Sequence, residues 1–183
     1  MNKTYIVTGN PGKVRELEAM SLGKLHFEMK DLDIPEIQSL DMREIVTEKL
    51  KHAFSIVKEP VIVDDVSAEL ERLNGLPGPF IKFFGQKLGR GALLKLAGKE
   101  GEKVTVRCIV AYYDGKEMIF GEGHVNGKLV SPRGENGFGF DSEIVPDGES
   151  RTMAEMSEEE KMAISHRGNA FRHLLSQLEV RSS

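Results

Sequence analysis

Cysteine, tryptophan and long apolar runs are scarce or absent in this chain. One cysteine, Cys108, and no tryptophan occur among 183 residues, which excludes an internal disulfide framework and a cysteine-rich zinc site. No apolar run reaches the roughly 18 residues that a membrane-spanning helix needs. The first apolar run is too short for a signal peptide. We therefore expect a cytoplasmic protein with no membrane partner, whose Cys108 is a buried thiol in a reducing compartment.

Excess positive charge is also missing. The formal net charge is −4 and the sequence pI about 5.8, so no global basic field attracts DNA or RNA, and we expect no nucleic-acid partner. An anionic ligand would have to be met by a local cluster of cations. With 39% hydrophobic and 30% charged residues, the chain has the composition of a globular protein. Its length and the absence of repeats or linkers predict a single domain over residues 1–183.

Apolar periodicity predicts alternating strands and helices. Residues 5–7, 25–29 and 61–63 are typical of strands, and a helix with apolar residues at 45, 46, 50, 53, 54 and 57 precedes the third of them. Strand, helix and strand in succession favour βαβ units and an α/β fold. Further along, we expect a helix over 92–97, a hairpin of strands 104–112 and 118–125, and a last helix with an apolar stripe from 170 to 178.

The first turn of the chain, Thr8 to Lys13, is a candidate anion site. It follows a strand and opens an amphipathic segment in which Pro11 suits the first helical position and Asn10 the N-cap. Free backbone N–H groups at a helix start bind anions, and a cation at Lys13 opposes the helix dipole unless a negative ligand is present. Neither G-x-G-x-x-G nor G-x-x-x-x-G-K-[ST] occurs. Many such turns only cap a helix, and Asn10 could either cap or contact phosphate.

Two carboxylates, Asp64 and Asp65, follow the apolar run 61–63 directly. At the carboxyl end of a strand they would lie at the edge where open α/β sheets place their ligands. They suit a hard cation such as Mg²⁺, which prefers oxygen ligands. The alternative is a pair of solvated turn residues or helix caps. Glu36, in the polar loop 31–41, is a further oxygen donor of the same kind.

Near the C-terminus, Ser165, His166 and Arg167 place three donors in a row at the head of the last helix. Taken alone, they would more often be exposed polar residues. Lys161 belongs to a charged run that would usually be a solvated helix face, after a capping box formed by Ser157 and Glu160. Phe138 and Phe140 flank Gly139 and would point the same way if the loop were extended, where aromatic rings could stack on a base.

Taken together and in order, these segments resemble the inosine triphosphate pyrophosphatase family, whose members hydrolyse ITP, dITP and XTP. The matching segments are Thr8–Lys13, Pro35–Glu36, Val63–Asp65, Gly75–Phe80, Gly137–Asp141 and Ala154–Arg167. The resemblance implies an α/β fold with a long twisted mixed sheet, flanking helices and two lobes around a central cleft. It also implies a homodimer, Mg²⁺ as cofactor and a purine nucleoside triphosphate as substrate.

The resemblance implies roles for individual residues. For the triphosphate these are Thr8, Gly9, Asn10, Lys13 and Lys49. Glu36 and Asp65 resemble the metal-binding carboxylates, with Asp65 also aligning or deprotonating the attacking water. Val66 adjoins this motif among the substrate-binding residues. For the base, the implied residues are Phe138, Gly139, Phe140, Asp141, Lys161, His166 and Arg167.

Departures from the family pattern leave alternatives open. The family usually has Glu-Asp followed by Thr or Ser, where this chain has Asp64, Asp65 and Val66. Phe140 stands where Tyr or Trp is frequent, and Ser142 where Pro is common. Two further hypotheses are therefore kept: a nucleotide pyrophosphatase with another base preference, and a non-catalytic nucleotide-binding module, which Val66 favours.

Overall fold

The computed structural model describes residues 3–21, 26–137 and 139–181. It divides the chain into two compact units. Unit 1 consists of Met1–Asp65, Cys108–Gly123 and Asn169–Ser183, and unit 2 of Val66–Arg107 and His124–Gly168. Each unit has its own cluster of buried apolar side chains. The single domain expected from composition stays a prediction, and so does the cleft that the resemblance implies.

Within the described residues, seven strands form one mixed sheet in the order β2-β1-β3-β5-β6-β7, with β4 paired to β3. They are β1 Thr4–Val7, β2 Phe27–Lys30, β3 Val61–Leu70, β4 Pro77–Gly78, β5 Lys103–Tyr113, β6 Met118–Leu129 and β7 Ile144–Pro146. Strand β1 runs parallel to β2 and β3, whereas the β3–β4 and β6–β7 pairs are antiparallel. Both parallel pairs involve strands joined through a helix, so the α/β class is confirmed.

The helices lie where the periodicity predicts them, with shifts of a few residues at their ends. They are α1 Pro11–Met20, α2 Met42–Val57, α3 Ile81–Leu88, α4 Ala92–Ala97, α5 Glu158–Ile164 and α6 His166–Arg181. Short 3-10 turns occur at Glu71–Leu73 (η1), Asp141–Glu143 (η2) and Met153–Glu155 (η3). No helix in the described ranges is both long and apolar enough to cross a bilayer.

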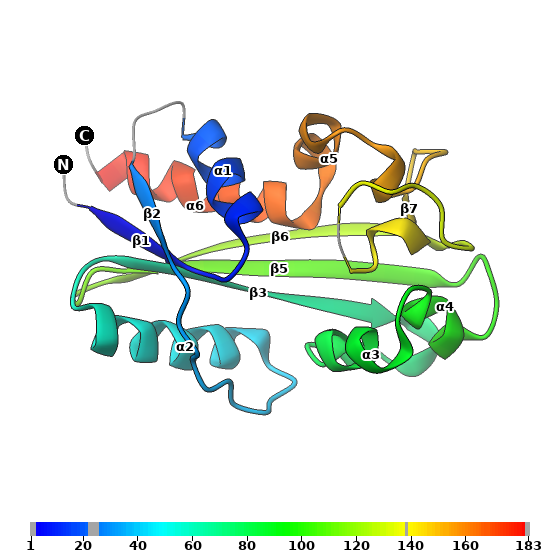
Figure 1. Cartoon of the computed structure of the whole chain (residues 1–183), viewed down its shortest axis with the longest axis horizontal. Coiled ribbons are helices and arrows are strands. Elements are labelled where there is room, and N and C mark those ends of the chain that lie inside the picture. The colour runs from blue at the N-terminus through cyan, green and yellow to red at the C-terminus, as the bar shows by residue number, and fades with distance from the viewer. Residues whose placement is uncertain (1–2, 22–25, 138, 182–183) are drawn as a thin grey trace. The chain divides into compact units, whose positions relative to one another are not determined.

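The core of unit 1 forms between α2 and the sheet. In this unit α2 covers one face of β1 and β3, while α1 and α6 lie on the other side (Figure 1). Helix α2 begins at Met42 because the Asp41 carboxylate accepts the N–H of Arg43 at 2.8 Å. The buried members of the cluster are Val7, Val46, Leu50, Ala53, Val57, Val61, Val63 and Ala111. The apolar stripe that the sequence predicts for α2 is therefore its buried face.

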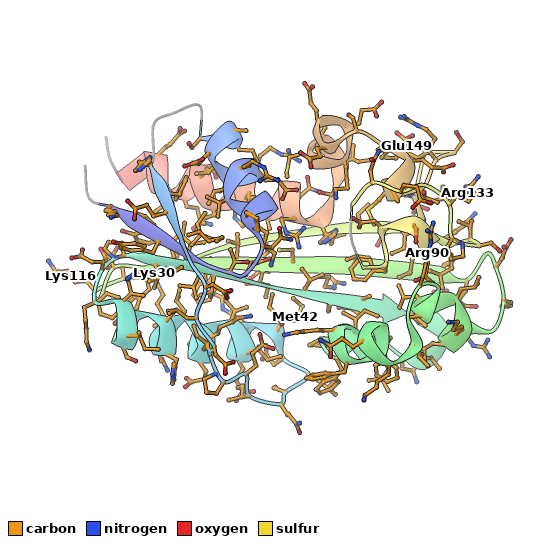
Figure 2. The ribbon with its side chains drawn as sticks, viewed as in Figure 1. Lys30, Met42, Arg90, Lys116, Arg133 and Glu149 are labelled. Carbon is orange, nitrogen blue, oxygen red and sulfur yellow. The ribbon has the colours of Figure 1, made fainter. Side chains whose placement is uncertain are left out.

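The rim of this part of the sheet is polar. The Lys30 ammonium, at the end of β2, lies 4.4 Å from the centre of the Tyr5 ring, within the range of a cation–π contact. Lys30 is labelled in Figure 2. At the opposite end of the same strand pair, the Lys3 ammonium contacts Glu28 at 2.6 Å. Polar contacts thus lie at both ends of the short parallel pair β1 and β2. The start predicted for β2 at Leu25 falls outside the described residues.

Unit 2 has a core built on α4, β5 and β7. Its buried members are Ala68, Leu70, Ile81, Leu93, Ala97, Val104, Val106, Leu129, Ile144 and Met153. The N-cap residue of helix α4 is Gly91, which has no side chain that could accept the free N–H groups of the first turn. The buried Glu143 carboxylate supplies the acceptor instead and takes the N–H of Leu94 at 2.8 Å. Burial raises the pKa of the Glu143 carboxyl, because desolvation opposes its charge.

One predicted boundary is wrong. The apolar run 61–63 was expected to be a whole strand ending before Asp64, but β3 continues to Leu70. Asp64 and Asp65 therefore lie inside the strand and not beyond its end. Carboxylates are disfavoured in strand interiors, and here the charge of the buried Asp64 is balanced by Lys13. That partner lies far away in the sequence, which is why the local pattern suggested an end.

Gly121, on β6, provides a test of packing in unit 1. A methyl group added at this position would lie 2.2 Å from the Ala170 carbonyl oxygen and 2.6 Å from the Leu174 nitrogen, both in α6. Because these are backbone atoms, G121A should lower the free energy of unfolding by about 3 kcal/mol. The measurement is urea unfolding followed by circular dichroism.

Gly85 is the matched control, since it lies inside α3 with nothing within 4 Å of an added methyl group. G85A should leave stability unchanged or raise it by about 0.5 kcal/mol, because alanine favours a helix. Equal stability of G121A and G85A would contradict the close approach of α6 to β6.

Candidate functional site

The turn from Thr8 to Lys13 is held by its own polar groups. The Asn10 side chain accepts the N–H of Gly12 at 2.9 Å, and the Asn10 N–H donates to the Thr8 hydroxyl at 3.1 Å. Pro11 is the first residue of α1. The predicted N-cap is confirmed, and phosphate contact by Asn10 stays a prediction. The arrangement leaves a helix start of the kind that binds anions.

Lys13 points back from α1 onto β3. Its ammonium contacts both carboxylate oxygens of Asp64, at 2.7 and 2.9 Å. Asp64 is 7% exposed. The parallel pairing of Ile6 with Ile62 explains this contact, because the chain leaves β1 only two residues later and Asp64 follows Ile62 by two. The cation in the first turn of α1 is thus neutralised by a carboxylate from the neighbouring strand.

Lys49 forms the second cationic point of unit 1. It lies about two turns into α2 and its ammonium contacts the Glu36 carboxylate at 2.7 Å and the Asp64 carbonyl oxygen at 3.2 Å. The Asp65 carboxylate lies 3.8 Å away. Burial lowers the pKa of Lys49, but the charges of Asp65 and Glu36 outweigh this effect and raise the pKa above the ordinary value of a lysine. Lys49 therefore stays charged throughout the neutral and mildly alkaline range.

Glu36 and Asp65, the predicted metal ligands, are brought to the same ammonium. Among the described residues, no group of three or more His, Cys, Asp or Glu side chains converges as a metal site. Two carboxylates nevertheless fit Mg²⁺, which usually takes one or two from the protein and completes its shell with waters and substrate phosphates. The donor chemistry therefore suits the expected cofactor.

A glycine-rich loop begins at Gly134 in unit 2, and its first residues, 134–137, are held by several hydrogen bonds. The Asn136 N–H donates to the Ala154 carbonyl at 3.0 Å, and the Asn136 side chain donates to the Met156 carbonyl at 3.1 Å. Arg90, labelled in Figure 2, donates to the Gly134 carbonyl at 2.8 Å. A side chain at Gly134 would meet the backbone of Ala154 at 2.4 Å. This end of the loop is thus seated directly on the segment that precedes α5.

The far end of the loop is not extended. Gly139 has φ +63° and Phe140 has φ −95° and ψ 4°, so the condition under which the two rings would point the same way is not met here. Positive φ at glycine allows the chain to turn there. Phe140 instead packs against the core of unit 2, and its ring centre lies 6.1 Å from that of His166. Phe138 lies outside the described residues.

Lys161 and Asp141 form a buried ion pair. The ammonium lies 3.1 Å from the carboxylate, and both side chains are less than a tenth exposed. The solvated helix face expected for Lys161 is therefore wrong. The capping box of α5 is confirmed, with the Ser157 hydroxyl accepting the Glu160 N–H at 3.1 Å. The capping box fixes where α5 begins and therefore which of its residues face the protein interior. Lys161, one residue after Glu160, is on the buried face.

Ser165, His166 and Arg167 are buried, at 2%, 4% and 4% exposed, so the interpretation as exposed polar residues is wrong. The Ser165 hydroxyl accepts the N–H of Gly168 at 3.1 Å and so closes the first turn of α6. An added methyl group at Gly168 would lie 1.9 Å from the Met162 carbonyl oxygen. Glycine at this position therefore permits the first turn of α6 to lie this close to the backbone of α5.

Val66 begins unit 2 and packs, half-buried, against its core. Its role in substrate binding stays a prediction. The sequence offered Asp64 as a possible cation ligand and Ser165 as one of three donors, but the family resemblance assigned neither of them a site role, and Gly168 was not singled out. For Asp64 the available signal was its place beside Asp65. For Gly168 it was a glycine directly after two basic residues at the head of a predicted helix.

Comparisons with known proteins identify the family of this chain. The Ham1 family model matches residues 4–177. The chain belongs to the Ham1 family. Inosine triphosphate pyrophosphatase 2 of Trypanosoma cruzi is 41% identical over 173 residues, which cover 92% of this chain and 88% of that protein. A dITP/XTP pyrophosphatase of Thermococcus kodakarensis is 38% identical over 177 residues, with 94% and 95% covered.

A solved Ham1 family structure shares the fold. The Ham1 protein of Staphylococcus aureus superimposes with a TM-score of 0.84 at 28% identity, over 98% of this chain and 99% of that one. The family named from the sequence motifs is thereby confirmed. Roles of individual residues stay predictions, which the following variants address.

The buried pair in unit 2 can be tested by stability. K161M leaves the Asp141 carboxylate buried without its ammonium and should cost about 3 kcal/mol of unfolding free energy. The control is R151M, since Arg151 forms an exposed pair with Glu160 beside the same helix, and exposed pairs contribute little. In urea unfolding, D141N/K161M should regain part of the loss. A K161M midpoint equal to that of R151M would contradict the buried pair.

Proposed function

We propose that this chain is a nucleoside-triphosphate pyrophosphatase that hydrolyses ITP, dITP and XTP to the monophosphate and pyrophosphate. Membership of the Ham1 family and the activities for which its relatives are named support the reaction class. The observation that carries the proposal is the cluster in unit 1, where Lys13 and Lys49 meet Glu36, Asp64 and Asp65 beside a helix start. Two cations and several hard oxygen donors suit a metal-complexed polyphosphate.

In this proposal the start of α1 binds the triphosphate. Thr8, Gly9 and Asn10 offer backbone N–H or side-chain groups, and the helix dipole favours negative charge there. Lys13 and Lys49 balance the charge of the leaving pyrophosphate. Phosphoryl transfer depends mainly on positioning and charge neutralisation, which this set of groups supplies.

Glu36 and Asp65 would hold magnesium, which supplies charge neutralisation at phosphate oxygens when bound. The Asp65 carboxylate orients a water molecule towards the α-phosphorus and accepts its proton. The water oxygen forms the new bond to phosphorus while the bond to the α–β bridging oxygen breaks. The electron pair of that bond leaves with pyrophosphate, towards the lysine ammonium groups.

The base is assigned to unit 2. Hypoxanthine and xanthine have an acceptor oxygen at C6, where adenine has an amino donor. The donors of His166 and Arg167 would pair with the oxygen and disfavour the amino group, while Phe140 gives a ring for stacking. Asp141, Lys161, Gly139 and Phe138 complete the proposed pocket. Val66 is included among the substrate-binding residues.

The proposal includes Mg²⁺ as cofactor, a homodimer as the assembly and the cytoplasm as the location. The cofactor and the assembly follow from the resemblance, and the location from the sequence features given above. The single, buried Cys108 is compatible with a reducing compartment.

Pyrophosphate release from ITP with Mg²⁺ at alkaline pH tests the function. ITP should exceed ATP in kcat/KM by about 10⁴-fold, because a site built on hydrogen bonds to one base edge rejects the mismatched one. XTP and dITP should behave as ITP does. Equal rates for ATP and ITP would contradict the base assignment. No release from any of these nucleotides would favour the non-catalytic nucleotide-binding module.

D65N tests the role of the metal-side carboxylate. The variant should bind nucleotide with Kd near the wild-type value and lose turnover by about 10³-fold, because the group that accepts the proton is gone. Turnover is measured as pyrophosphate release, and binding by calorimetry. The control is E59Q, which removes one exposed negative charge from the turn before β3. An unchanged kcat in D65N would exclude the proposed role.

A further inference from the structure

The lysines proposed to bind phosphate already have carboxylate partners in this chain. Lys13 donates to both oxygens of Asp64, and Lys49 donates to Glu36. An anion that enters the site must therefore compete with charge-assisted hydrogen bonds, which are the stronger kind. The competition between the anion and the carboxylate differs between the two lysines, because Glu36 is a proposed metal ligand and Asp64 is not.

For Lys49, the partner carboxylate is also a proposed metal ligand. A divalent cation at Glu36 and Asp65 would take over these oxygens, so the N–H groups of Lys49 become available to phosphate when the metal is bound. Lys13 is different, since Asp64 is not needed for that exchange. The Asp64 side chain is 6% exposed, and Asp64 lies in the interior of β3. If Lys13 left, a buried carboxylate would lose its ammonium, which is costly.

The charge of the cluster points the same way. Two ammonium groups face three carboxylates, Glu36, Asp64 and Asp65, so the formal charge of the five side chains is −1. The excess negative charge of these five side chains disfavours a bare polyphosphate more than one that carries a divalent cation. Of the three carboxylates, Asp64 is the one whose removal would release a cation without removing a proposed metal ligand.

We infer that Asp64 is an internal counter-ion that limits the affinity of Lys13 for free pyrophosphate. The inference rests on the proposed function and deepens it: Asp64 weakens retention of the metal-free product and so favours its release. Asp64 is then a positioning residue that acts through Lys13, and it does not touch the reacting atoms.

The test is binding of inorganic pyrophosphate to the full chain in EDTA, measured by calorimetry. D64N should bind pyrophosphate about tenfold more tightly than wild type, because one buried negative charge beside Lys13 is removed. E59Q removes one exposed negative charge elsewhere in unit 1 and should bind as wild type does. D64E keeps the charge on a longer side chain and should stay within about threefold of wild type.

Unchanged or weaker pyrophosphate binding by D64N would overturn the inference. Weaker binding would mean that Asp64 holds Lys13 ready for phosphate. If circular dichroism shows that D64N is unfolded, D64S is held to the same expectation. Wild type provides a further measurement: free pyrophosphate should bind at least tenfold more weakly than pyrophosphate with Mg²⁺, and equal affinities would overturn the inference as well.

The result is separable from that of the activity assay on the same preparation. Hydrolysis of ITP by wild type together with unchanged pyrophosphate binding by D64N removes only the counter-ion role. Absence of hydrolysis by wild type together with tighter pyrophosphate binding by D64N would contradict the proposed activity. The role of Asp64 as counter-ion of Lys13 would then still hold.

Discussion

The parallel pairing of β1 with β3 is the constraint on which the site of unit 1 depends. It places the turn after Val7 beside the interior of β3, so Lys13 meets Asp64 although the two lie far apart along the chain. Sheet hydrogen bonds hold the backbone of β3 at Asp64, and helix α1 holds that of Lys13, so mainly the side chains are left to adjust. Helix α2 then adds Lys49 from its flank. The cations are positioned by rigid elements, which suits a reaction that depends on placement more than on covalent help.

Both units bury ammonium–carboxylate pairs where a lone charge would be expensive. Lys13 with Asp64 in unit 1 and Lys161 with Asp141 in unit 2 follow the same rule. Each pair keeps charged groups inside the protein without ligand. Replacing one charged partner by another costs less than desolvating a solitary charge. The net affinity of any ligand at such a pair would be the difference between the old and the new contacts.

Most of the fold could be predicted from local patterns. The apolar face of α2, the cap at Asn10 and the capping box at Ser157 are short-range features, and all three are present. The length of β3 could not be predicted, because Asp64 and Asp65 are poor strand residues until a distant lysine balances them. The burial of Lys161 was missed for the same reason. Local propensity describes a residue with its neighbours, and it does not report a partner from another element.

The sequence alone was enough to name the family, because its motifs can be recognised in the sequence in their order. They include the turn at Thr8–Lys13, the paired acids at 64 and 65, and the run of donors at 165–167. Tertiary structure decided which carboxylate faces which lysine, and how deeply each is buried. Those pairs join residues 51, 13 and 20 positions apart. Contacts at such separations depend on strand pairing and helix packing, whereas periodicity extends only a few residues along the chain.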